Sequence, residues 1–114
     1  MSFVTRQGRF DLRVPVIFGV GAEQVTAETH NIGLGGVFVA TREAPPVGQR
    51  VSLQLALPDW DESHIVNGEV RWVRGAGDSS RPDGSPGMGV RFGKLSLYVV
   101  AALANFVRLH ARGT

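Results

Sequence analysis

The sequence contains no cysteine. That absence excludes disulfide bonds, a thiolate nucleophile and a metal site with cysteine ligands. It agrees with a reducing compartment, and we expect a cytoplasmic location. The first thirteen residues contain no apolar stretch of the kind found in secretory signal peptides. The longest apolar stretch, residues 97–109, is interrupted by Asn105 and is too short to cross a bilayer, so no membrane span is expected.

Lysine is almost absent from the chain. Twelve residues are lysine or arginine, and Lys94 is the sole lysine. A GC-rich genome would explain this preference, and so would recognition of phosphate groups or guanine edges, for which arginine is better suited. The formal net charge is only +2 and the basic residues form no run, so DNA is not expected as a partner.

Sequence signatures of catalysis are also missing. The chain has no nucleophile-elbow motif, no phosphate-binding P-loop and no acid pair with a defined geometry. His30, His64 and His110 are scattered, and no carboxylates lie at metal-ligand spacing from them. We therefore expect a binding domain that is not an enzyme and that holds no metal or cofactor.

What the chain does contain is a series of short apolar stretches typical of β-strands. Its 114 residues match the length of one domain. The alternation of apolar and polar residues is clearest in VSLQLAL, and in EVRWV it places Val70 and Trp72 together on the expected core face. Strands are predicted at residues 14–20, 24–29, 37–41, 51–57, 69–73 and 88–92.

After the strands the sequence pattern changes to that of a helix. Residues 75–87 are rich in Gly, Ser, Pro and Asp and predict a long hairpin loop. A helix is predicted over residues 97–112, with Ser96 as its N-cap and Gly113 after its end. The order of elements predicts a mostly β fold, a small six-stranded antiparallel barrel with a C-terminal α-helix.

Two short segments combine arginine with glycine. Arg9 and Arg13 precede the first predicted strand, and residues 31–36 (NIGLGG) lie between the second and third. Positions i and i+4 of an extended chain point the same way, so both guanidinium groups can face one ligand and grip its phosphates bidentately. The glycines permit positive φ and close approach of the backbone. These features predict an anion-binding site; the alternative is two solvated surface charges, one of them paired with Asp11.

The order of these segments resembles that of PilZ domains, small six-stranded barrels that bind the bacterial messenger cyclic di-GMP. The R-x-x-x-R motif of the family matches residues 9–13, and its D/N-x-S-x-x-G motif matches residues 31–36. Two later segments, GEVRWV and GMGVRF, resemble strands of the same family, so the likeness covers residues 6–110. It implies an N-terminal arm at residues 1–13 that carries the arginine motif, and a PilZ-like barrel with its helix at residues 14–114.

The resemblance implies a non-enzymatic cyclic di-GMP receptor with Arg9, Arg13, Asn31, Gly33 and Gly36 as ligand-binding residues. Asn31 would read a guanine edge through its amide, although the residues alone allow an Asx-turn equally well. Gly33 replaces the serine of the family motif and offers only its backbone. One lost hydrogen bond, about 0.5–1.5 kcal/mol, and added glycine freedom, about 0.5–1 kcal/mol, predict roughly 5- to 70-fold weaker binding.

The predicted helix is apolar around most of its circumference. One face contains Leu97, Val100, Ala101 and Ala104, and further apolar surface comes from Tyr98, Val99, Phe106 and Leu109. A helix of this kind is buried or meets a partner, so a protein partner or a homodimer through this helix is expected. The alternative function is a degenerate PilZ-like interaction module that does not bind the nucleotide, in which substitution of Phe106 or Leu109 would disrupt an assembly.

Overall fold

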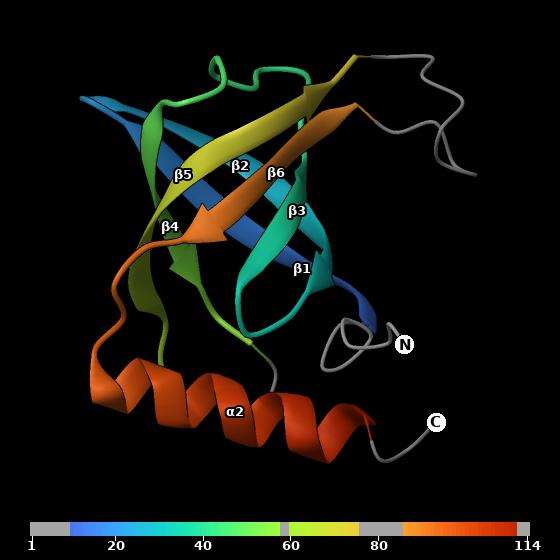
Figure 1. The fold of residues 1–114 in the computed structure, drawn as a ribbon, viewed down its shortest axis with the longest axis vertical. Coiled ribbons are helices and arrows are strands. Elements are labelled where there is room, and N and C mark those ends of the chain that lie inside the picture. Colours follow the sequence, from blue (N-terminus) through green and yellow to red (C-terminus); the bar gives the residue numbers. More distant parts are fainter. Residues whose placement is uncertain (1–9, 58–59, 76–85, 112–114) are drawn as a thin grey trace.

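The computed structural model describes residues 10–57, 60–75 and 86–111. Six antiparallel strands close into a barrel, and one helix lies across an open end of it (Figure 1). The elements are β1 (Phe10–Val20), β2 (Glu23–Ile32), β3 (Gly36–Ala40), β4 (Arg50–Leu55), β5 (His64–Arg74), β6 (Gly87–Phe92) and α2 (Leu97–Ala111). Their order around the barrel is β1-β2-β3-β6-β5-β4, and β4 pairs with β1 to close it. The predicted six-stranded barrel with a C-terminal helix is confirmed.

The core fills the inside of the barrel with alternate residues of every strand. In β4, for example, Val51, Leu53 and Leu55 are buried while Arg50 and Gln54 are exposed. Three residues of α2 join the same apolar cluster and cover the open end, namely Val99, Leu103 and Phe106. Each such side chain contributes about 1.5–3 kcal/mol when it leaves water, so the helix is an integral part of the fold.

The helix begins where the sequence predicts. Ser96 caps it, since the backbone N–H of Val99 donates to Ser96 Oγ at 3.1 Å. The predicted face of Leu97, Val100, Ala101 and Ala104 is exposed, and α2 packs on the barrel through its other side. Among the described residues, no helix has the length and hydropathy of a membrane span.

Two predicted boundaries are wrong in a way that affects the site. β1 begins at Phe10, so Arg13 lies inside a strand rather than ahead of it. β2 continues to Ile32, so Asn31 also lies in a strand and the turn is confined to residues 33–35. Arg9 and most of the predicted loop at residues 75–87 lie outside the described residues.

Candidate functional site

Arg13 occupies a point where the pairing of β1 with β2 is interrupted. The register shifts between Asp11 and Val14. At this point the hydroxyl of buried Thr29 bonds to the backbone of Val14, accepting from Val14 N at 3.4 Å and donating to Val14 O at 3.3 Å. This β-bulge keeps Val14 in the core and sends Arg13 outward, with 58% of its side chain exposed.

Two side chains of β2 lie beside the Arg13 guanidinium. Its Nη1 atom is 3.2 Å from His30 Nε2 and 3.9 Å from Glu28 Oε1. Glu28 is thus a carboxylate near Arg13, whereas the side chain of Asp11, the partner considered from the sequence, lies outside the described part of the chain. An ion pair this exposed contributes about 1 kcal/mol at most, so a phosphate group can displace it.

Asn31 shares the outer surface of the barrel with Phe38. The register between β2 and β3 shifts between Thr29 and Asn31, which makes His30 the extra residue of a second bulge, and Asn31 pairs with Phe38. Asn31 Oδ1 is buried and has no hydrogen-bond partner among the described residues. The Asx-turn alternative is wrong because that oxygen accepts no bond from its own loop.

The glycine turn is held at both ends by backbone hydrogen bonds. Gly33 N donates to Gly36 O at 3.0 Å, and Gly35 O accepts from Phe92 N at 2.9 Å. Among the described residues positive φ occurs at Gly21 and Gly48, so the expected positive φ in this turn is wrong. Gly36 is required for a different reason, because a Cβ there would lie 2.3 Å from Val90 O on β6. Its role is close packing of β3 against β6.

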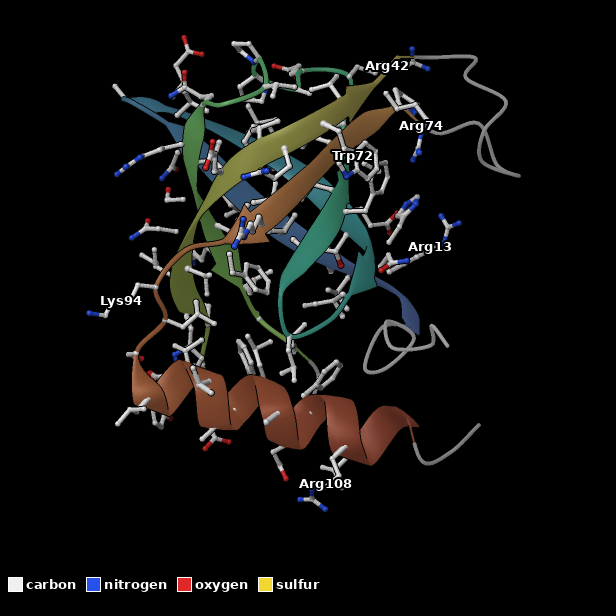
Figure 2. The ribbon with its side chains drawn as sticks, viewed as in Figure 1. Arg13, Arg42, Trp72, Arg74, Lys94 and Arg108 are labelled. Atoms are coloured by element: carbon white, nitrogen blue, oxygen red, sulfur yellow. The ribbon has the colours of Figure 1, made fainter. Side chains whose placement is uncertain are left out.

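A cluster of aromatic and cationic side chains lies beside Arg13 on the outer side of the barrel strands, and three of its members are buried, with exposed fractions of 5% for His30, 2% for Phe38 and 6% for Arg74. The rings of His30 and Phe38 are 6.0 Å apart, and Phe38 stacks on Trp72 with centroids 5.5 Å apart and planes at 19°. The guanidinium carbon of Arg74 lies 4.4 Å from the Phe38 centroid. We call Arg13, His30, Phe38, Trp72 and Arg74 the outer strip, and Figure 2 shows its labelled members on one side of the barrel.

A groove of about 290 Å³ lies between the outer strip and the glycine turn. Trp72, Arg71 and Arg91 line it together with the backbone of Gly35 and Gly36. It therefore combines an indole ring, two guanidinium groups and exposed main chain within reach of one ligand. A planar base with an attached phosphate matches this set of groups, since indole stacks on a base and guanidinium binds phosphate.

The prediction that Trp72 lies in the core is wrong. The register of β5 against β6 shifts between Val70 and Trp72, so a bulge breaks the alternation and leaves Trp72 outside with 44% of its surface exposed. Gly89 provides the space, because a Cβ there would lie 2.2 Å from the indole. The sequence reasoning also missed Phe38, His30 and Arg74. Of these three, Phe38 could have been found from the sequence, because alternation along a strand turns it outward if its neighbours Val37 and Val39 face inward.

Comparison with known families decides the classification. The PilZ domain model matches residues 4–109. The chain belongs to the PilZ domain family. The described residues contain no cluster of three or more histidine or acidic side chains that could hold a metal ion.

Solved structures share the fold of this PilZ domain. The Bacillus subtilis inhibitor of motility (MotI/DgrA) superimposes with a TM-score of 0.77 at 16% identity, covering 94% of this chain and 51% of that one. Escherichia coli YcgR, solved in complex with c-di-GMP, gives 0.67 at 17% identity, covering 92% and 45%. The PilZ domain of CeSA from a cellulose-synthesizing bacterium gives 0.60 at 18% identity, covering 87% and 93%.

The chain thus spans about half the length of the first two of these proteins. No curated protein matches it by sequence. At such identities the structural likeness establishes the fold, and residue roles have to be argued from this chain itself.

Proposed function

We propose that this PilZ domain is a receptor for cyclic di-GMP and not an enzyme. The observation that carries the proposal is the outer strip, in which contacts lead from Arg13 of the first motif to Trp72 beside the turn of the second. The two motifs, far apart in sequence, are thereby joined by one chain of side-chain contacts on the outer side of the barrel. Membership of the family and the c-di-GMP complex of the YcgR structure support this ligand.

In the proposed complex Arg13 binds a phosphate and leaves Glu28. Arg9, the other arginine of the motif, would act with it. The Oδ1 atom of Asn31 has no donor among the described residues, and the N–H groups on a guanine edge would supply one. The second base would enter the groove beside Trp72, where Arg71 and Arg91 face its phosphate. The exposed backbone at Leu34 and Gly35 would provide further polar contacts in place of the serine hydroxyl, since Gly33 N, Gly35 O and Gly36 O already form hydrogen bonds within the fold.

Isothermal titration calorimetry with cyclic di-GMP tests the proposal. Arg13→Ala removes a charge-assisted contact of about 1.5–3 kcal/mol and should weaken binding roughly 10- to 150-fold. Arg108→Ala is the matched control, because Arg108 is exposed on α2 and points away from the barrel (Figure 2). Absence of heat with the unsubstituted protein at high micromolar ligand, or equal binding by Arg13→Ala, would refute the proposal.

A second candidate function is an interaction module that has lost the nucleotide. The exposed side of α2 favours it, since Leu97 is 87% exposed and Val100, Ala101 and Ala104 continue an uncharged face. The occupant we propose for this face is a second copy of the chain, because one apolar helix face can pack on itself about a two-fold axis. Sedimentation should then show a dimer that Val100→Glu converts to a monomer. A monomer at all concentrations would exclude this candidate.

A further inference from the structure

A second groove, of about 330 Å³, lies between α2 and the start of β5. Its lining includes Trp60, Asp61, His64, Tyr98 and Asn105. None of its described lining residues also lines the groove beside Trp72. Its volume is at the lower end of the range for small-molecule sites, which suits a single side chain or a small charged group.

Three aromatic rings form one wall of this groove. The centroids of Trp60 and His64 are 4.8 Å apart with planes at 71°, and those of His64 and Tyr98 are 5.1 Å apart at 75°. These edge-to-face contacts join a loop, a strand and a helix. The loop is fixed by a hydrogen bond from Trp60 N to Leu57 O at 2.9 Å. The wall is therefore already assembled before any ligand arrives, which lowers the entropy cost of binding.

The charge at this groove is negative, as it also is at a smaller groove lined by Glu23 and Glu43, whose described lining includes no tryptophan or tyrosine. Asp61 lines it and exposed Glu62 follows, whereas the described lining residues include no lysine or arginine. By contrast, Arg71 and Arg91 line the groove beside Trp72, and Lys94 belongs to a third groove. Arg108 donates a hydrogen bond to Asn105 Oδ1, but Figure 2 shows it directed away from the barrel.

We propose that this groove binds a cationic side chain, an arginine or lysine of a partner protein. Aromatic faces attract cations through their quadrupoles, and a neighbouring carboxylate adds a direct charge interaction. The same chemistry occurs within the molecule, where the Arg74 guanidinium lies over the rings of Phe38 and Trp72. The site does not depend on the nucleotide-binding function and would be a docking point for a basic segment.

The two tryptophans of the chain provide a test that separates the two sites. Trp60 borders the cation groove and Trp72 borders the nucleotide groove, so each indole N–H resonance in a ¹⁵N-labelled sample reports one site. The probe is a capped tetrapeptide, acetyl-Gly-Arg-Arg-Gly-amide. A saturable shift of the Trp60 resonance with the Trp72 resonance unmoved is expected. Cyclic di-GMP should move Trp72 alone, so either proposal can fail without the other.

Peptides and variants complete the experiment. A peptide with lysine in place of both arginines should bind at Trp60, whereas peptides with glutamate or leucine at these two positions should not. Asp61→Asn should weaken binding about two- to five-fold, while Glu43→Gln, an exposed acid outside this groove, should have no effect. Tyr98→Leu should weaken binding by a similar factor and Tyr98→Phe should retain it.

Three results would overturn the inference. They are equal shifts of the two tryptophans, a glutamate or leucine peptide as effective as the arginine peptide, and unchanged binding by Asp61→Asn. Because Asp61 and Tyr98 are both exposed, loss of the fold does not complicate these variants.

Discussion

At the scale of single residues, Arg13 is the main cation of the candidate nucleotide site, and it already contacts side chains of the protein itself. Arg13 lies 3.9 Å from Glu28 Oε1 and 3.2 Å from His30 Nε2, so a ligand phosphate must compete with a carboxylate for the same guanidinium. The competition is weak because both partners are about half exposed. This competition nevertheless lowers the affinity for the ligand, and one substitution can remove it.

Glu28→Gln should therefore strengthen cyclic di-GMP binding. Loss of the competing charge removes one attraction that holds Arg13 within the protein and also a repulsion of ligand phosphates, which together are worth about 1 kcal/mol or roughly five-fold in Kd. Calorimetry measures the change, and Glu23→Gln on the same strand serves as the control for net charge. Equal effects of the two substitutions would show that only net charge matters.

Gly33→Ser should also strengthen binding. Because Gly33 does not have positive φ, a serine can adopt its backbone conformation without strain, and its hydroxyl restores the group that the family motif carries. One hydrogen bond of about 0.5–1.5 kcal/mol predicts roughly 2- to 10-fold tighter binding by calorimetry. Gly75→Ser is the matched control, since a Cβ there meets nothing within 4 Å and Gly75 is not among the described lining residues of the groove. A protein that binds no ligand before or after Gly33→Ser would instead fit the interaction module.

At the scale of elements, the bulges explain which side chains the sequence could and could not place. The six strands follow from alternation and turn residues, and the motif spacing predicts Arg13 and Asn31 as residues of the site. Trp72 was misplaced because an extra residue in β5 shifts the alternation by one, and a bulge leaves no mark in the pattern of apolar residues. For α2, a sequence apolar on nearly every side contains no signal of which side packs inward.

Close packing of β3 against β6 is the element-scale requirement at the glycine turn. Gly36→Ala places a methyl group 2.3 Å from Val90 O and 3.3 Å from Arg91 Cα, atoms of a backbone that can move only if the strands separate. We expect a loss of about 1–3 kcal/mol in the free energy of unfolding, measured by chemical denaturation. Gly35→Ala should leave stability nearly unchanged. Equal stability of the two variants would contradict the packing role of Gly36.

At the scale of the whole molecule, the closed barrel divides the surface between two candidate sites whose described lining residues do not overlap. The nucleotide groove lies on the outer face of β3, β5 and β6, and the cation groove lies where α2 meets the barrel. The helix that covers the open end thus belongs to the core through one side and to the exposed surface through the other. Substitutions on the buried side and on the exposed side of α2 should therefore affect the protein differently.

Phe106→Ala should destabilise the protein rather than disrupt an assembly. Phe106 is 0% exposed and packs in the core with Val99 and Leu103, so the earlier prediction that it forms an interface is wrong. Removing a buried phenyl ring costs about 3–5 kcal/mol, which thermal and chemical denaturation would reveal. Leu97→Ala, on the exposed side, should change stability by less than about 0.5 kcal/mol. The contrary result is that Phe106→Ala leaves the unfolding transition unchanged and alters only the sedimentation coefficient. That result would show that the side of α2 with Phe106 forms an interface between molecules and does not cover the barrel core.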